Sequence, residues 1–558
     1  MTEFEPSAEQ SLAATSSKPN TVILAPPGCG KTEVLAYRAE HLISTLKPGQ
    51  KILALTFTNR ARANLRDRLR EVLGAERTRR FVTVRNFHGH AADIVLSHHR
   101  TLGLDLSDYV PPTTRTLARA LREVTTDAAA SRDASMLLGE AKRAAIDDHE
   151  VLATLSASPD RPGRTAAIAA ETARQQANAL HYDDLLRHAQ RLLAIPGVQH
   201  LYNCHYGAVL VDEFQDLSLQ QLDLVERTCA TSRTFAGDPL QGIYSWAGAQ
   251  PDQVVSVLNT ACPDPIKLSE SYRSSPRVLA LVNSIGTQLG AAALHSAQED
   301  AWPDSGFGAA FVFEDFADEA TKVVDAARLL LEQNPKLSIG VISRSAWRRK
   351  VLDERFATSD LPMRRWDLAV DDPHILQLVR DAMAQLPRGV GFEAARDGVL
   401  DTVDPADVDT IEQIEEVFTF LEQSGLPTPR AALRTLRSTG EPQRAVSPGV
   451  HLLNAHTGKG QQFDWTFVIG LEEKHVPDRR SSAGAQLAEE MRVLLVMLSR
   501  ARHGLVVTSV ATLTGRFGPY PAIRSRWYSA LEAAAPNAWT AFAAHVEVAV
   551  TGAPKLAP

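Results

Sequence analysis

Residues 21–32 read Thr-Val-Ile-Leu-Ala-Pro-Pro-Gly-Cys-Gly-Lys-Thr, an apolar run that leads into a glycine-rich turn. Residues 33–46 then have the composition of a helix. A strand, a turn and a helix start bind phosphate, because backbone N–H groups and the helix dipole point at the anion. Gly28 and Gly30 let the backbone approach closely, Lys31 can reach the β- and γ-phosphates, and the Thr32 hydroxyl suits magnesium. The stretch predicts a nucleotide site made of Ala25 (where the usual pattern has glycine), Pro26, Pro27, Gly28, Cys29, Gly30, Lys31 and Thr32.

A second apolar run, Val209 to Val211, ends in two carboxylates. Asp212 suits a magnesium ligand that acts through water, and Glu213 suits the base that orients or deprotonates the attacking water. The run has the character of a buried strand, which favours this interpretation over a strand that simply ends in solvent. The two runs together predict an enzyme that binds ATP and Mg²⁺ and hydrolyses ATP, with Thr32 and Asp212 as the metal-binding residues.

Composition limits the class of protein. At 558 residues the chain is expected to hold roughly three to four domains, and its hydrophobic fraction of 44% supports sizeable cores. No apolar run approaches the roughly 20 residues that span a membrane, and the acidic residues 1–6 do not resemble a secretion signal. Four scattered cysteines indicate a reducing cytoplasm and disfavour a zinc or iron–sulfur site. With a formal net charge of -7, any nucleic-acid binding must be local.

Four further motifs follow in a fixed order. They are Phe235–Trp246, Leu268–Ser274, Ala455–Gly460, and Glu489–Arg492 leading to Leu498–Ala501. With the first two runs they resemble the UvrD/Rep/PcrA family of superfamily 1 helicases, over roughly residues 5–265 and 266–531 without insertions. The resemblance implies an α/β fold of two RecA-like motor domains with parallel sheets, each carrying a mostly helical insertion.

The same resemblance divides the chain into segments. The first motor domain is expected at 1–88 and 181–265, interrupted by a helical insertion at 89–180. The second motor domain is expected at 266–366 and 444–535, interrupted by a short acidic insertion at 367–443. Residues 536–558 form a C-terminal tail in this division.

The resemblance also assigns residues to the nucleotide site. Gln10 is similar to the glutamine that reads the adenine edge, and Arg38 and Tyr272 to the pair that sandwiches the base. Gln241 is similar to the γ-phosphate sensor, and Arg273 and Arg500 to the two arginines that the second motor domain supplies. These last three form, with Glu213, the predicted catalytic set. Gly460 and Gln462 complete the predicted nucleotide-binding residues, Gln462 standing where the family has glutamate.

Single-stranded DNA, or DNA with a single-stranded tail, is the partner that the resemblance implies. Aromatic side chains stack on bases without reading sequence, while polar groups grip phosphates. An arginine-rich stretch, residues 60–85, fits either phosphate contacts or a solvated helix face. The predicted DNA-binding residues are Phe57, Asn59, His88, Tyr244, Trp246, Arg344 and His456.

Several positions depart from the family pattern. Ala247 replaces an arginine, and Ser271 and Met491 replace an asparagine and an arginine. These changes leave hydrolysis intact on physical grounds but weaken the case for tight coupling and strong unwinding. The acidic second insertion is expected to contact protein rather than DNA, or to be a solvated helix pair. Phe517 is a candidate strand-separating wedge, although an ordinary turn fits its glycine-rich segment better.

Three functions therefore stand side by side. The first is a 3′–5′ DNA translocase or helicase that acts in DNA repair, recombination or phage defence. The second is a DNA-sensing regulatory ATPase that activates a partner nuclease with little unwinding, similar to the helicase subunit of Gabija-type defence systems. The third, a nucleotide-binding protein with an inactive motor, is disfavoured because the predicted ATP-site residues are all present.

Overall fold

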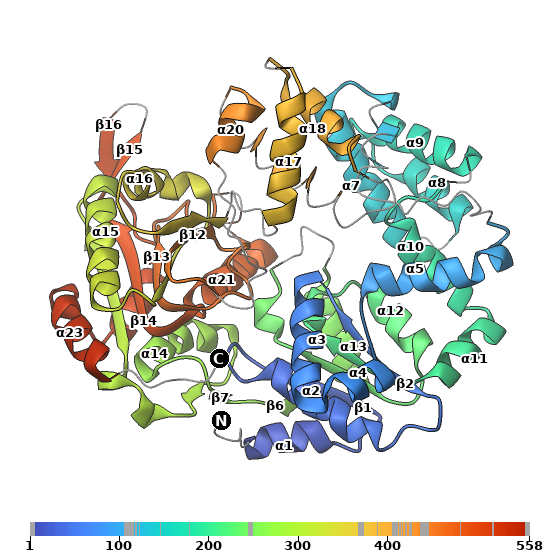
Figure 1. Ribbon diagram of the computed structural model, residues 1–558, viewed down its shortest axis with the longest axis horizontal. Helices are drawn as coiled ribbons and strands as arrows, with labels where there is room; N and C mark the ends of the chain where they lie inside the picture. The colour runs from blue at the N-terminus through green and yellow to red at the C-terminus, as the bar shows by residue number, and fades with distance from the viewer. Residues whose placement is uncertain are drawn as a thin grey trace.

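Two parallel six-stranded sheets, each flanked by helices, form the body of the molecule (Figure 1). The computed structural model describes residues 6–552 except 58, 105–116, 118–119, 122, 145–146, 178, 244–248, 367–372, 388, 404–410, 412–413, 416, 419–420, 423–426, 436–445, 480, 482 and 516–517. The predicted fold class, two motor domains with parallel sheets and helical insertions, is confirmed.

The first sheet has the strand order β3-β2-β4-β5-β1-β6, and every pair in it is parallel. Its inner strands are mostly apolar and buried on both faces, as a parallel sheet between two helix layers requires, whereas the edge strands β3 and β6 are partly exposed. All strands end at one edge, where the loops that follow them meet. The strands are β1 (Asn20–Leu24), β2 (Lys51–Thr56), β3 (Val82–Asn86), β4 (Tyr206–Asp212), β5 (Arg233–Gly237) and β6 (Ile266–Lys267). The helices are α1 (Ala8–Thr15), α2 (Lys31–Ile43), α3 (Asn59–Leu73), α4 (Ala75–Phe81), α5 (Phe87–His98), α10 (Asp184–Leu193), α11 (Pro196–His205), α12 (Leu219–Thr228) and α13 (Pro251–Ala261).

The second sheet has the order β11-β12-β10-β13-β14-β9, again with parallel pairs throughout. Phe542 and Val546, from the predicted C-terminal tail, are buried in its core. The strands are β9 (Phe307–Phe313), β10 (Ser338–Ser343), β11 (Met363–Arg365), β12 (Gly449–Asn454), β13 (Phe463–Ile469) and β14 (Ala501–Val510). The helices are α14 (Pro276–Gly286), α15 (Phe316–Gln333), α16 (Ala346–Ala357), α21 (Gly484–Leu498), α22 (Tyr528–Ala534) and α23 (Phe542–Gly552).

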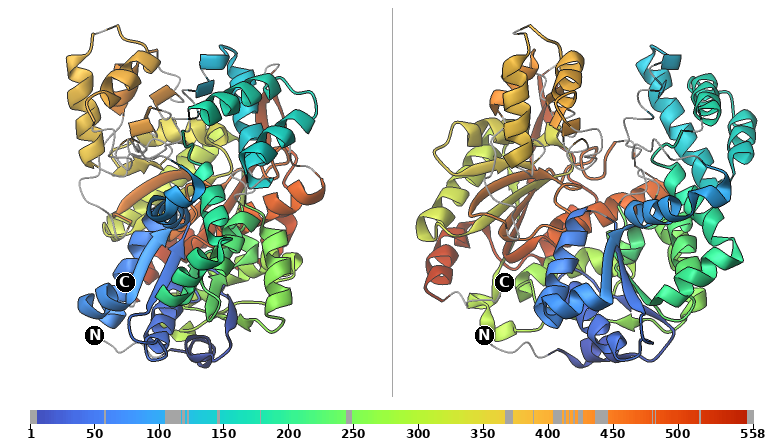
Figure 2. Two further views of the ribbon diagram at one scale, coloured as in Figure 1. Left: turned by 90° about the vertical axis from the view of Figure 1, so that its right-hand side faces the viewer. Right: turned by 45° about the vertical axis from the view of Figure 1, so that its right-hand side comes forward.

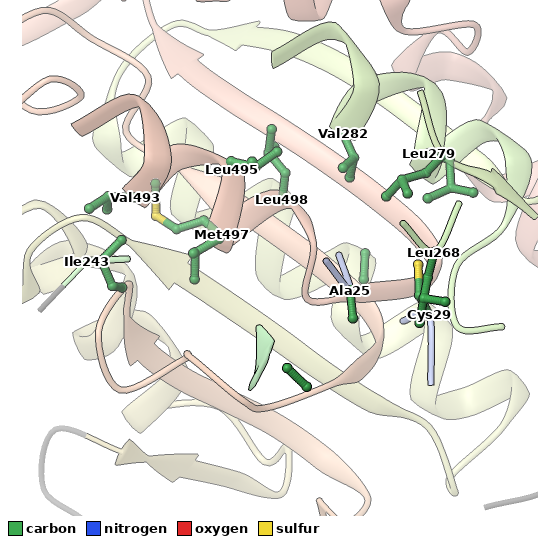
Figure 3. Close-up of a cluster of buried hydrophobic side chains, with 14 of the residues drawn as sticks. Ala25, Cys29, Ile243, Leu268, Leu279, Val282, Val493, Leu495, Met497 and Leu498 are labelled. Atoms are coloured by element: carbon green, nitrogen blue, oxygen red, sulfur yellow. The ribbon is translucent and has the colours of Figure 1, made fainter. Parts of the chain in front are cut away.

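One apolar cluster is continuous across the two halves (Figure 3). It joins the glycine-rich turn of the first half to the two helices of the second half that lie against it. Because these side chains are removed from water on both sides, the two sheets are held in contact next to the nucleotide site. The residues labelled in the view are Ala25, Cys29, Ile243, Leu268, Leu279, Val282, Val493, Leu495, Met497 and Leu498.

Helical segments interrupt each half and stand on the same side of the two sheets (Figure 2). The first comprises α7 (Ala128–Ala144), α8 (Asp148–Ala157) and α9 (Arg164–Gln176). Buried charges tie it to α10, since Lys142 Nζ lies 2.9 Å from Asp184 Oδ2 and 3.2 Å from Glu171 Oε2. The second comprises α17 (Pro373–Gln385), α18 (Phe392–Leu400) and α20 (Pro429–Thr435) around a core of its own. Of its acidic residues, Asp404, Asp407, Asp409, Glu412 and Glu416 lie outside the described residues.

A short antiparallel hairpin follows β14, formed by β15 (Thr512–Gly515) and β16 (Gly518–Pro521). The predicted wedge, Phe517, lies between these strands but outside the described residues. Among the helices that the structure describes, none is long and apolar enough to cross a membrane.

Candidate nucleotide and DNA sites

The glycine-rich turn places α2 end-on to the nucleotide site. Gly30 is the N-cap of α2 and, like Gly28, has a left-handed backbone (φ of 75° and 86°). A Cβ on Gly28 would lie 2.6 Å from Ser271 Oγ and 2.7 Å from Arg273 Cβ. Glycine is therefore needed at position 28 for the backbone angle and for the close approach of the second motor domain.

Lys31 and the two carboxylates at the end of β4 form one cluster that is largely shielded from solvent. Lys31 Nζ lies 3.3 Å from Asp212 Oδ1 and also pairs with Glu213 Oε1. Burial opposes the charge on Lys31, but Asp212 and Glu213 outweigh it and raise the pKa of Lys31. Burial also raises the pKa of Asp212, whereas Lys31 and Lys459 outweigh burial at Glu213 and lower its pKa to about 2. Glu213 itself has a left-handed backbone (φ 57°), which aims its side chain back at Lys31.

The residues present fit a magnesium ion. Asp212 ends β4, and Thr32 lies in the first turn of α2 beside the phosphate-binding turn. Mg²⁺ takes oxygen ligands and is usually held by one or two carboxylates together with substrate phosphates. Within the described residues no cluster of three or more His, Cys, Asp or Glu side chains could hold a metal without such help. Thr32 and Asp212 therefore suit a Mg²⁺ ion that binds together with the nucleotide.

Helix α1 lies at the far end of the glycine-rich turn. Gln10 Nε2 donates to Cys29 O at 3.0 Å, and Gln10 closes a capping box with Ser7. Glu9 accepts from Ser269 N and Ser269 Oγ at 2.7 and 2.8 Å, which joins α1 to the segment that follows β6. The Tyr272 N–H donates to Gly28 O at 2.9 Å. Gln10 and Tyr272, both predicted to bind the base, thus contact the same turn.

Arg38, which is predicted to sandwich the base with Tyr272, is buried at 1% exposure between α2 and the end of α1. Its N–H groups donate to Ala14 O at 3.2 Å, to Ser16 O, and to Thr234 Oγ1 at 3.3 Å. Arg38 therefore satisfies carbonyls at the C-terminal end of α1, where a helix leaves acceptors unpaired. Burial lowers its pKa to about 10.

The predicted γ-phosphate residues meet at the boundary of the two halves. Arg500 is buried, and its Nη2 donates to Gln241 Oε1 at 3.3 Å. Arg273 Nη1 donates to Ser499 O at 3.5 Å. Burial, with Arg500 and Arg502 beside it, lowers the pKa of Arg273 to about 9. The mutual repulsion of Arg273 and Arg500 favours an anion beside them, which suits the charge of a γ-phosphate.

Lys459 is a functional residue to which the sequence analysis gave no role. Its Nζ donates to both carboxylate oxygens of Asp216 at 2.7 Å and to Gln241 O at 2.8 Å. Burial raises the pKa of Asp216 to about 6 despite this partner. The sequence does contain one signal for Lys459, because this residue lies within the Ala455–Gly460 motif. Gly460 and Gln462, predicted to bind nucleotide, flank the same turn, with Gly460 exposed and Gln462 half-buried.

The predicted DNA-binding residues that the structure describes lie after four strands. Phe57 follows β2, His88 follows β3, Arg344 follows β10 and His456 follows β12. Parallel strands place these positions at the edge of each sheet where ligands bind. Asn59 begins α3, while Tyr244, Trp246 and Ala247 lie outside the described residues.

His88 and Arg344 are each engaged by another side chain. His88 stacks on Tyr182 with ring centroids 4.0 Å apart, and burial lowers its pKa to about 4. Arg344 makes a bidentate ion pair with Glu490 of α21, with contacts of 2.7 and 3.0 Å. In the arginine-rich stretch, four side chains pair with carboxylates of the same half: Arg68 with Glu33 and Glu71, Arg70 with Asp67, Arg77 with Glu40, and Arg85 with Asp93.

Comparison with known proteins agrees with this geometry. Residues 7–261 match the UvrD/REP helicase N-terminal domain, and residues 404–512 match the UvrD-like helicase C-terminal domain. The chain belongs to the UvrD-like helicase family. It is 27% identical to the ATP-dependent DNA helicase UvrD2 of Mycobacterium tuberculosis, over 90% of this chain and 78% of that protein. It is 24% identical to DNA helicase II of Escherichia coli, over 90% of this chain and 84% of that protein. As a member of this family it is an ATP-hydrolysing enzyme.

Proposed function

We propose that the chain is a translocase that moves 3′ to 5′ along single-stranded DNA and separates duplex ahead of it. One segment, residues 239–243, carries the proposal because residues of both sites contact it. Arg500 donates to the side chain of Gln241, and Lys459 donates to the Gln241 carbonyl. His456, a predicted DNA-binding residue, is hydrogen-bonded to the backbone of Ile243. A movement of Arg500 or Gln241 on γ-phosphate binding can therefore reach His456, a predicted DNA-binding residue, through residues 239–243.

The cluster at β4 suggests how hydrolysis is switched on. In the structure Lys31 pairs with Asp212 and Glu213 and suppresses the basicity of Glu213. When Lys31 turns to the phosphates, Glu213 loses its main positive partner and its pKa rises. Glu213 then accepts the proton of the attacking water, while Arg273 and Arg500 meet the charge on the γ-phosphoryl group. Magnesium held by Thr32 and Asp212 would neutralise phosphate charge.

The test is ATP hydrolysis by the purified chain with and without single-stranded DNA at two salt concentrations. Strong stimulation that weakens at higher salt is expected, because phosphate contacts release counterions. The Glu213→Gln variant should bind ATP but turn it over about 10²- to 10⁴-fold more slowly. Unwinding of duplexes with a 3′ tail but not a 5′ tail would support the polarity. Hydrolysis that ignores DNA, or normal turnover by Glu213→Gln, would refute the proposal.

The regulatory ATPase remains a second candidate. It is favoured by the ion pair of Arg344 with Glu490, which engages one predicted DNA contact within the protein itself. Ala247, in place of the family's arginine, points the same way. Under this alternative the acidic second insertion contacts a partner nuclease. Co-purification with a nuclease and weak unwinding by the isolated chain would support it, whereas efficient unwinding by a monomer would exclude it.

A further inference from the structure

Trp347 is a large apolar side chain that is exposed on the second motor domain. It lies in the first turn of α16 and is 65% exposed. Three residues before it is Arg344, the predicted DNA contact at the end of β10. Helix α16 stands at the side of the sheet toward the helical insertions (Figure 1). An exposed indole costs hydration free energy, so a surface that keeps one is typically a binding surface.

One face of the Trp347 ring is covered by another ring. His475 stacks on it with ring centroids 5.3 Å apart and an interplanar angle of 27°. Burial lowers the pKa of His475, so at neutral pH the imidazole is uncharged and stacks as a flat apolar ring. The backing holds the indole in one orientation and leaves its outer face to solvent. A rigid ring with one open face is the arrangement that stacks on a base.

The ring pair is connected to the predicted DNA contact. Glu490 accepts from the Asp478 N–H at 2.9 Å, three residues beyond His475, and also holds Arg344. Glu490 therefore fixes the His475 segment and the Arg344 side chain relative to each other. The stack of Trp347 on His475 and the two bonds of Glu490 thus link Trp347 to Arg344 beyond the end of β10.

The charge around the rings suits a polyanion. Lys350 is exposed one turn along α16, on the face that Trp347 occupies. Lys474 and Arg479 are exposed on the segment that carries His475. The nearby buried carboxylate of Glu472 is neutralised by Arg348, with a contact of 2.9 Å. Exposed cations beside an aromatic face are the features that bind a nucleic-acid strand: stacking for bases and positive charge for phosphates.

We propose that the Trp347–His475 pair is a base-stacking platform that extends the single-stranded DNA path over the second motor domain. The inference rests on the proposed function, because it requires that the chain bind single-stranded DNA. One unpaired base stacks on the outer face of Trp347, and Lys350 and Lys474 contact the neighbouring phosphates. Arg344 joins this path when phosphate replaces Glu490 as its partner.

The test is equilibrium binding of a fluorescently labelled oligothymidylate to the full chain, measured by anisotropy without ATP. Trp347→Ala should weaken binding by roughly 5- to 150-fold, the loss of one stacked base, while Trp347→Phe retains most of the affinity. Lys350→Gln should weaken binding less and reduce the salt dependence of affinity by about one phosphate contact. Leu201→Ala is the matched control, since Leu201 is 57% exposed on α11 of the other motor domain. Thermal unfolding of each variant checks that the fold is intact.

The outcomes separate this inference from the proposed function. If the unmodified chain binds no single-stranded DNA, the proposed function fails and the platform fails with it. If the chain binds DNA and Trp347→Ala binds within about twofold of it, the platform alone is wrong and the exposed ring serves another contact. A further arm replaces single bases of the oligonucleotide by abasic sites. An abasic site at one position of the oligonucleotide should weaken binding by the unmodified chain but should not weaken binding by Trp347→Ala further. Equal losses of affinity in both proteins would overturn the assignment.

Discussion

Replacing Lys459 by methionine tests whether a single interdomain ion pair controls the closed arrangement of the motor. Methionine keeps the length and apolar stem of lysine but removes three donor contacts: two of 2.7 Å to Asp216 and one of 2.8 Å to Gln241 O. The pair is nearly dry, with side chains 8% and 3% exposed. Removing one partner of a buried ion pair costs about 3–5 kcal/mol.

The cost should fall near the lower end of that range. The pKa of Asp216 is already raised to about 6 with Lys459 present. Without the lysine, its carboxyl takes up a proton at neutral pH rather than remaining charged and unpaired. About 3 kcal/mol corresponds to a shift of roughly 150-fold between closed and open arrangements. Since Arg500 reaches Gln241 only across the same boundary, ATP turnover should fall when closure is lost.

The assay combines steady-state ATP turnover with small-angle scattering of the nucleotide-free chain. Lys459→Met is expected to lower turnover by at least about tenfold and to increase the radius of gyration. Asp216→Asn is the matched control: it removes the ion pair but keeps the positive charge of Lys459 near Glu213. Turnover and scattering unchanged in both variants would show that the pair does not hold the domains together.

Three further substitutions test other parts of the site. Gly28→Ala should lower turnover by about tenfold or more, measured by steady-state kinetics, because Gly28 has a left-handed backbone and an added Cβ would push Arg273 away; normal turnover would contradict this. Arg38→Met should reduce the free energy of unfolding in denaturant titrations by about 2–4 kcal/mol, with the KM for ATP within about twofold. A large rise in KM without loss of stability would restore the base-binding interpretation. His90, whose pKa burial and Arg85 lower to about 3, costs stability as the pH falls from about 6.5 toward 3. Stability–pH curves of His90→Gln should flatten in that window by up to about 1.4 kcal/mol per pH unit, and an unchanged slope would assign the acid sensitivity to other groups.

The parts of the site that sequence predicted are those that the chain builds locally. The glycine-rich turn and the carboxylates of β4 are contiguous runs whose chemistry depends on strand ends and a helix start, and both patterns are visible in sequence. The strands that carry them were predicted for the same reason, since buried parallel strands are near-continuous apolar runs.

What sequence missed depends on partners far along the chain. Lys459 and Asp216 are 243 residues apart, and Glu9 and Ser269 are 260 apart. No local pattern reports that such residues meet. The contacts of Arg38 could not be predicted for a related reason: Arg38 lies seven residues after Lys31, about two turns along α2. The packing of α1 against that helix decides which way the arginine faces, and a motif cannot specify that packing.

The burial of the cysteines has a practical consequence for watching this motor work. Of the four thiols, Cys29, Cys229 and Cys262 are buried and Cys204 is exposed. Burial raises the pKa of Cys29, so its thiol stays protonated and unreactive beside the nucleotide. The second motor domain has no cysteine at all. One added cysteine at an exposed position there, such as Lys322 on α15, would give a two-site labelled protein in which dye pairs follow opening and closing turnover by turnover.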